Sequence, residues 1–111
     1  MMNSTELGLR DEDLRSIVKI IAASKPVDAA LVFGSRAKGT YRIGSDIDIA
    51  LTGNSLCHDD IVELSCVLNE ESVLPYRFDL VDYHALANHA LRDHIDRVGK
   101  VIFTRRNKAS V

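Results

Sequence analysis

The chain has 111 residues, a length typical of one domain with a single hydrophobic core, so any active site should be shallow and open. Hydrophobic residues make up 46% and charged residues 27%, which excludes a disordered or fibrous protein. The 14 basic and 16 acidic residues give a net charge of -2, which argues against a protein that coats a long nucleic acid. We expect a cytoplasmic location, because neither an apolar run of about 18 residues nor a secretion leader is present.

The first half of the chain predicts one helix and two strands. Residues 1–10 are polar and aperiodic, so we expect a flexible arm there. An amphipathic helix should begin at Asp11 and end before Pro26. Its apolar positions recur with helical spacing at Leu14, Ile17, Val18 and Ile21. Residues 29–33 are all apolar and predict a strand buried on both faces, whereas residues 46–51 alternate like a strand with carboxylates on one face.

The second half predicts two helices that alternate with two strands. One helix should cover about residues 59–71, and the next should run from an N-cap at Asp82 to a C-cap at Gly99. The strands should cover residues 76–81 and 101–104. This alternation indicates an α/β or α+β fold, with one sheet of about four strands covered by helices. The predicted organisation is an arm at 1–10, a domain at 11–104 and a basic tail at 105–111.

Gly34 and Ser35 directly follow the predicted strand at 29–33. A Gly-Ser step lets the backbone turn tightly, and if Ser35 begins a short helix, its N–H groups and hydroxyl converge on a point that attracts phosphate. Basic side chains between this step and the next strand could balance a triphosphate. Tyr41 in the same segment could contact a nucleotide or simply pack. The predicted nucleotide-binding residues are Gly34, Ser35, Arg36, Lys38 and Arg42.

Asp46 and Asp48 lie two positions apart on a predicted strand, so both side chains project from one face with their roots roughly 6.5 to 7 Å apart. Asp79 lies inside the strand at 76–81, where a carboxylate is costly to bury unless its face is open or holds a cation. If this strand pairs beside that of Asp46, the three carboxylates form one cluster. Because Mg²⁺ prefers carboxylate and phosphate oxygens, we predict that this catalytic cluster holds two magnesium ions.

The histidines and cysteines are assigned no chemistry. His84, His89 and His94 recur every five residues and therefore do not share one helix face, so we expect them at the surface. Neither cysteine belongs to a metal-ligand pattern. Asp82 is expected to cap a helix. The other residues expected at the surface or in packing are His58, Cys57 and Cys66.

The Gly-Ser step, ten intervening residues and the Asp-x-Asp pair, with Asp79 on a later strand, resemble the minimal nucleotidyltransferase (MNT) domain of the DNA polymerase beta superfamily. The resemblance covers about residues 11–104 and implies the polymerase-beta-like fold with a mixed sheet. It also implies that Ser35 holds the nucleotide phosphates, that Asp46 and Asp48 bind both magnesium ions, and that Asp79 binds one and activates the acceptor.

Small free-standing MNT proteins are similar to antitoxins encoded beside a HEPN-domain RNase toxin. The resemblance therefore implies that this chain transfers AMP from ATP to a tyrosine hydroxyl of such a toxin and so neutralises it. Larger nucleotidyltransferases carry a domain that binds the acceptor, and 111 residues leave no room for one. We therefore expect a protein partner to supply the acceptor.

Two other functions stay open. The chain could be a non-catalytic antitoxin that binds its toxin and occludes it, and neutralisation would then survive the loss of Asp46 and Asp48. It could also transfer a nucleotide to a small-molecule hydroxyl, as antibiotic nucleotidyltransferases do. Resistance conferred by this gene alone would favour that last function.

Overall fold

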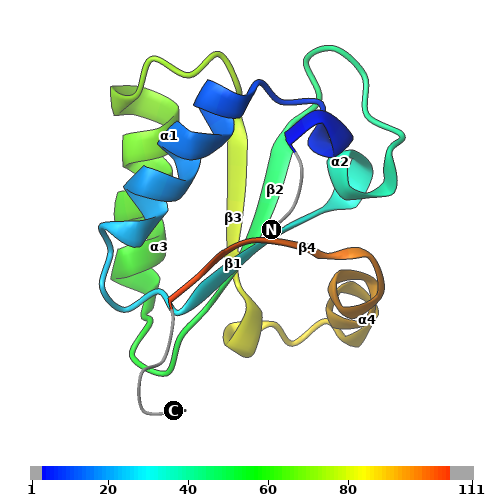
Figure 1. Ribbon diagram of the computed structural model, residues 1–111. Helices are drawn as coiled ribbons and strands as arrows, with labels where there is room; N and C mark the ends of the chain where they lie inside the picture. Colours follow the sequence, from blue (N-terminus) through cyan, green and yellow to red (C-terminus); the bar gives the residue numbers. More distant parts are fainter. Residues whose placement is uncertain (1–3, 106–111) are drawn as a thin grey trace.

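A computed structural model describes residues 4–105 of the chain (Figure 1). Helices and strands alternate along most of it, as the sequence predicts. In chain order the elements are η1 (Ser4–Leu7), α1 (Asp11–Ala22), β1 (Ala29–Phe33), α2 (Gly34–Lys38), β2 (Ile47–Thr52), α3 (His58–Cys66), η2 (Val67–Glu71), β3 (Phe78–Asp82), η3 (Tyr83–Ala85), α4 (His89–Val98) and β4 (Lys100–Thr104). The segments η1 and η3 are 3-10 turns, and η2 is a π-helical turn that continues α3.

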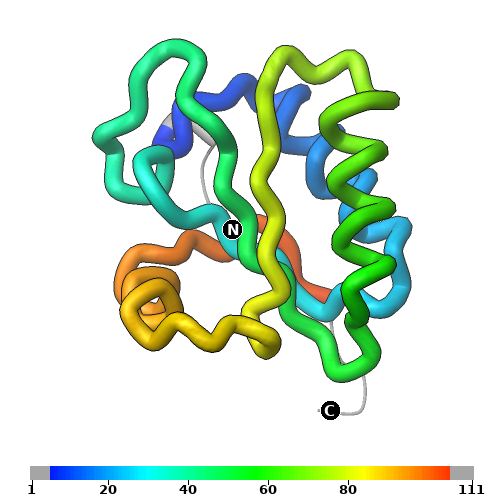
Figure 2. Tube along the Cα trace, turned by 180° about the vertical axis from the view of Figure 1, so that it is seen from behind, coloured from blue at the N-terminus to red at the C-terminus, as the bar shows by residue number. Residues whose placement is uncertain are grey.

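The four strands form one mixed sheet in the order β3-β2-β1-β4. β1 pairs antiparallel with both β2 and β4, whereas β2 and β3 are parallel. Figure 2 shows β2 and β3 side by side, with α3 making the connection between them. The predicted α+β fold with one mixed, helix-covered sheet is confirmed.

Alternating side chains divide the sheet into two faces. Ile47, Ile49 and Leu51 point toward α1 and α3, where they join the main hydrophobic core. On the other face, Phe33 and Ala50 pack against Ile95 of α4 in a smaller apolar cluster. Figure 1 shows the same division, with α1 and α3 on one side of the sheet and α4 on the other. The carboxylates of the predicted site lie on the α4 side, because they alternate with the core residues.

The N-terminal segment differs from the predicted flexible arm. The chain turns through η1, and the side chains of Leu7 and Leu9 are 1% and 6% exposed in the main core. The two leucines lie outside any regular periodicity, so only their tertiary contacts reveal them as core residues. Of the predicted basic tail, Arg105 donates hydrogen bonds to the backbone carbonyls of Ala22, Ser24 and Val27, and residues 106–111 lie outside the described residues.

The helix predicted from Asp82 begins later than expected. Asp82 does act as a cap, but its carboxylate accepts the N–H of His84 and holds only the short η3 turn. The chain is then extended until Asn88, whose side chain accepts the N–H of Leu91 and caps α4. Gly99 is the C-cap, as predicted. Between the two caps, Leu86 packs against the smaller apolar cluster.

No helix among residues 4–105 is both long enough and apolar enough to cross a membrane.

Candidate active site

Gly34 forms the turn that leaves β1 and enters the short helix α2. Its φ of +73° lies in the left-handed region, which glycine adopts without strain. A Cβ atom at this position would collide with Oδ2 of Asp48. The missing side chain therefore brings the predicted phosphate-binding turn directly against a predicted metal-binding carboxylate.

The three predicted carboxylates gather at the end of β1 and the beginnings of β2 and β3. Asp48 is opposite Phe33 in β1 and, on its other side, opposite Asp79 in the parallel pairing with β3. Asp46 is exposed immediately before β2, and Asp79 is exposed on the edge strand. The condition set by the sequence is met, because the strand of Asp79 pairs with the strand that follows Asp46. The register alone places the carboxylates on one face.

The charges of these carboxylates act on one another. Burial raises the pKa of Asp48 above its ordinary value, and the neighbouring charges of Asp79 and Asp46 raise it further, whereas His94 opposes the shift. Half-burial and like charges both disfavour an ionised carboxylate, so this site would gain from a bound cation.

The donor set suits magnesium, although the side chains are not arranged around an ion. Among residues 4–105, no group of three or more histidine, cysteine, aspartate or glutamate side chains is close enough to hold a metal. Carboxylate oxygens are nevertheless the ligands that Mg²⁺ prefers, and it commonly joins one or two of them to substrate phosphates. Asp48 and Asp79 are opposite each other on one face, and the backbone of the Gly34 turn lies against Asp48. The residues therefore fit a magnesium ion that completes its coordination with phosphate oxygens.

Arg36 does not fit its predicted role in nucleotide binding. It is only 3% exposed, and its guanidinium donates hydrogen bonds of 3.0 to 3.3 Å to three backbone carbonyls. These acceptors belong to Leu7, Gly8 and Ser45. Because an arginine has only five N–H groups, this side chain has little donor capacity left for a phosphate. Arg36 instead ties the N-terminal segment to the loop before β2, so its role is structural.

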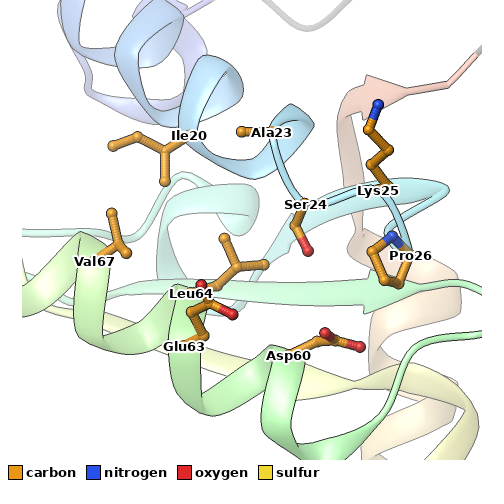
Figure 3. Close-up of a pocket in the computed structure, with 9 residues that line it drawn as sticks. All are labelled: Ile20, Ala23, Ser24, Lys25, Pro26, Asp60, Glu63, Leu64 and Val67. Carbon is orange, nitrogen blue, oxygen red and sulfur yellow. The ribbon is translucent and has the colours of Figure 1, made fainter.

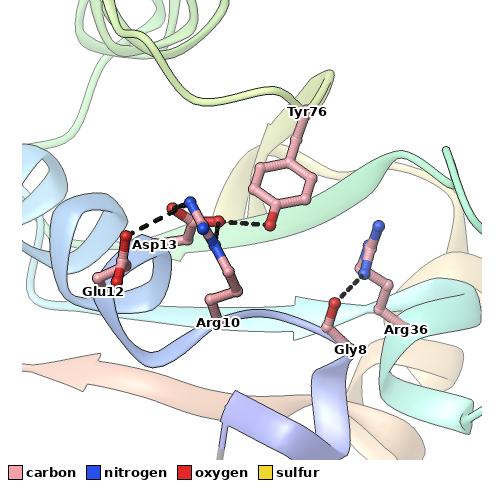
Figure 4. Close-up of polar contacts among 6 residues, drawn as sticks. All are labelled: Gly8, Arg10, Glu12, Asp13, Arg36 and Tyr76. Atoms are coloured by element: carbon pink, nitrogen blue, oxygen red, sulfur yellow. Dashed lines mark hydrogen bonds and ion pairs between the residues drawn. The ribbon is translucent and has the colours of Figure 1, made fainter.

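Aromatic rings enclose the Arg36 guanidinium. The rings of Tyr41 and Tyr76 each lie with their centroid 5.4 Å from its central carbon, so Tyr41 packs on this cation. Tyr76 also donates a 2.6 Å hydrogen bond to Asp13, which Arg10 contacts as well (Figure 4). The pKa of Asp13 lies below its ordinary value. The main cause is the hydrogen bond from Tyr76, and the second is the hydrogen bond from Arg10.

The other predicted nucleotide ligands keep positions compatible with binding. Ser35 is half-buried at the start of α2, and Lys38 and Arg42 are exposed in the segment that leads to Asp46. Within that segment the N–H of Arg42 donates to the hydroxyl of Ser45. Their contacts with a nucleotide stay predictions.

His94 is a site residue that the prediction missed. Its Nε2 accepts a 3.3 Å hydrogen bond from the N–H of Gly34, and its ring meets that of Phe33 edge-on. His84 and His89 are exposed, as predicted, but His94 is half-buried beside the turn. A usable signal exists in the sequence, because His94 falls on the apolar stripe of α4. That stripe comprises Leu91, His94, Ile95 and Val98.

A separate pocket of about 450 Å³ lies between α1 and α3 (Figure 3). Its lining includes Lys25, Asp60 and Glu63, but none of the predicted site residues. It belongs to the helix layer on the opposite face of the sheet from Asp48. The candidate site is therefore the face of the sheet that carries Asp48 and Asp79.

Comparisons with known proteins show what the chain as a whole is similar to. Residues 15–108 match the family model described as "Polymerase beta, Nucleotidyltransferase". The "Probable protein adenylyltransferase MntA" of Haemophilus influenzae is 31% identical over 106 residues, which span 92% of this chain and 89% of that protein.

Two solved structures are similar over most of the chain. One is a toxin–antitoxin crystallised with AMP-PNP, with a TM-score of 0.69, 28% identity, and coverage of 84% of this chain and 74% of that one. The other is a toxin–antitoxin of MntA that carries a tyrosine-to-alanine substitution, with a TM-score of 0.67, 29% identity, and coverage of 83% and 72%.

Proposed function

Because the chain belongs to the nucleotidyltransferase family of polymerase beta, we propose that it is an antitoxin that transfers AMP from ATP to a tyrosine of a HEPN-domain toxin. The observation that carries this proposal is the close approach of the Gly34 backbone to Asp48, with Asp79 beside it in register. It puts a turn suited to phosphate next to carboxylates suited to magnesium. The resemblance to an MntA protein and to a toxin–antitoxin crystallised with AMP-PNP supports the adenylyl donor and the toxin partner.

Most of the site residues would bind the nucleotide, and one would face the acceptor. Ser35, with the exposed Lys38 and Arg42, would hold the triphosphate, and Asp46 and Asp48 would hold two magnesium ions against it. When bound, magnesium would neutralise phosphate charge and lower the pKa of the attacking hydroxyl. Asp79, also a magnesium ligand, lies on the edge strand and lines an open groove of about 570 Å³, so it faces the side that an acceptor can reach.

In the proposed reaction, the tyrosine oxygen attacks the α-phosphorus of ATP in line. A bond forms between that oxygen and the α-phosphorus, and the bond to the bridging β-phosphate oxygen breaks. Pyrophosphate leaves toward Ser35 and the basic segment, while the hydroxyl proton passes to Asp79. Positioning and charge stabilisation account for most of the catalysis in such transfers.

The proposal is tested with purified chain, Mg²⁺, ATP and the toxin encoded beside it. Mass spectrometry should show the toxin gaining one or more AMP groups on a tyrosine. The pair of substitutions Asp46→Asn and Asp48→Asn should abolish the gain, whereas Asp93→Asn, in an exposed ion pair with Arg97, should leave it intact.

Neutralisation of the toxin by the double variant, in a stable complex without AMP, would instead establish inhibition by occlusion. Transfer to a small-molecule hydroxyl with no labelling of the toxin would contradict the proposed acceptor.

A further inference from the structure

Asn69 pairs with the first residue of β3 as a neighbouring strand would. Its Oδ1 accepts the N–H of Phe78 at 2.8 Å, and its Nδ2 donates to the carbonyl of Phe78 at 3.0 Å. β3 is an edge strand, so its outward backbone groups bond no other strand among residues 4–105. The Asn69 amide therefore closes the open edge of the sheet at this one residue.

The amide of Asn69 is held in one orientation. The Phe78 carbonyl accepts only from the nitrogen and the Phe78 N–H donates only to the oxygen, and Nδ2 also donates to the hydroxyl of Ser65 at 3.2 Å. The wide turn η2 carries Asn69, and Ser72 closes that turn by donating its N–H to the carbonyl of Val67. A π-helical turn inside a helix often accompanies a functional position.

The start of β3 is thus bonded from both sides. On the inner side, the carbonyl of Arg77 accepts the N–H of Ile47 at 2.8 Å, and on the outer side Asn69 holds Phe78. Asp79 is the next residue, opposite Asp48. Because the side chain of Asp79 is exposed, the placement of its backbone decides where its carboxylate lies.

We propose that Asn69 is a positioning residue for Asp79, fixing the start of the edge strand so that this carboxylate stays opposite Asp48. The inference rests on the proposed transfer reaction. In the proposed function the nucleotide binds at Ser35, Asp46 and Asp48. The hydrogen bonds of Asn69 go to Ser65 and Phe78 instead. Loss of Asn69 should therefore slow the transfer and leave the apparent affinity for ATP unchanged.

The test is the steady-state transfer of AMP by Asn69→Ala. The kcat should fall about 10- to 100-fold, as is typical when a residue that orients a metal ligand is lost, with the KM for ATP unchanged. In an Asp79→Asn background the same substitution should have no further effect, because its target is gone. Ser65→Ala, which removes one of the three hydrogen bonds of the amide, should give a smaller loss of the same kind. This milder variant tests the proposal even if Asn69→Ala does not fold.

The matched control is Ser72→Ala. Its hydroxyl donates to the carbonyl of Leu68 in the same turn, so the substitution costs local stability without touching β3. An equal fall in kcat for Ser72→Ala, or an undiminished effect of Asn69→Ala in the Asp79→Asn background, would show that Asn69 only supports the fold.

Binding of Mn²⁺, followed by electron paramagnetic resonance, separates this inference from the proposed function. If the unaltered chain transfers no AMP, the proposed function fails, but the placement of Asp79 is still measurable. Asn69→Ala should then weaken Mn²⁺ binding by about 10-fold or more, and only while Asp79 is present. Unchanged Mn²⁺ binding would overturn the role of Asn69.

Discussion

The N–H of Gly34 donates to Nε2 of His94, so a helix near the end of the chain holds the turn that faces the carboxylates. His94 is therefore the acceptor for this backbone N–H. A buried N–H that loses its acceptor costs free energy unless another group replaces it.

His94→Ala should lower the free energy of unfolding by about 1 to 3 kcal/mol, because the Gly34 N–H loses its partner. It should also raise the dissociation constant for ATP, since the turn beside Asp48 is no longer fixed. Urea denaturation and titration with a fluorescent ATP analogue measure the two effects. His89→Ala, on the exposed side of the same helix, should change neither. If both variants behave alike, the contact between His94 and Gly34 has no role.

Asp48→Asn should stabilise the folded chain at pH 7 while abolishing transfer. Burial and the charges of Asp79 and Asp46 raise the pKa of Asp48 above 3.8, so the folded state binds this proton more tightly than the unfolded chain. The stability associated with protonated Asp48 is complete below that value and is lost as the pH rises through the folded pKa. Urea denaturation should show a gain for Asp48→Asn at pH 7 that disappears below about pH 4. A loss of stability at pH 7 would contradict this sign.

Arg36→Ala should lower the free energy of unfolding by at least about 3 kcal/mol, because the carbonyls of Leu7, Gly8 and Ser45 lose their hydrogen-bond donor. Arg36→Lys should recover little of this loss, since one ammonium cannot reproduce the forked guanidinium. The N-terminal segment should also become cleavable, which limited proteolysis followed by mass spectrometry detects. The exposed Arg42 is the matched control, and Arg42→Ala should leave stability unchanged and raise the KM for ATP. A stable Arg36→Ala variant with a raised KM would return Arg36 to the nucleotide ligands.

The strands and the acidic cluster were predictable because local patterns determine them. The apolar run at 29–33 became β1 without change, and the alternation around Asp48 and Asp79 correctly gave the face on which each carboxylate lies. The parallel pairing of β2 and β3, which the sequence alone leaves as a condition, then brings the two together. Short-range periodicity was sufficient for these elements.

The remaining site residues depend on contacts between distant segments. Arg36 has the charge and the donors of a phosphate ligand. Only the folded structure shows that its guanidinium donates to the carbonyls of Leu7 and Gly8. The five-residue spacing that His94 shares with His84 and His89 hides its place on the apolar stripe of α4. Asn69 carries no sequence signal of its own, because its partners are backbone groups of β3.

The parallel register of β2 and β3 links the integrity of the site to correct folding. Phe78 and Leu80, on either side of Asp79, are buried in the main core. A shift of β3 by one residue would exchange the faces, placing the Asp79 carboxylate among apolar side chains and both apolar residues in water. Insertions or deletions between η2 and β3 should therefore be tolerated only when the loop absorbs them. A chain that reaches its packed core has, by the same step, brought Asp79 to the side of Asp48, so misregistered molecules would be unstable as well as inactive.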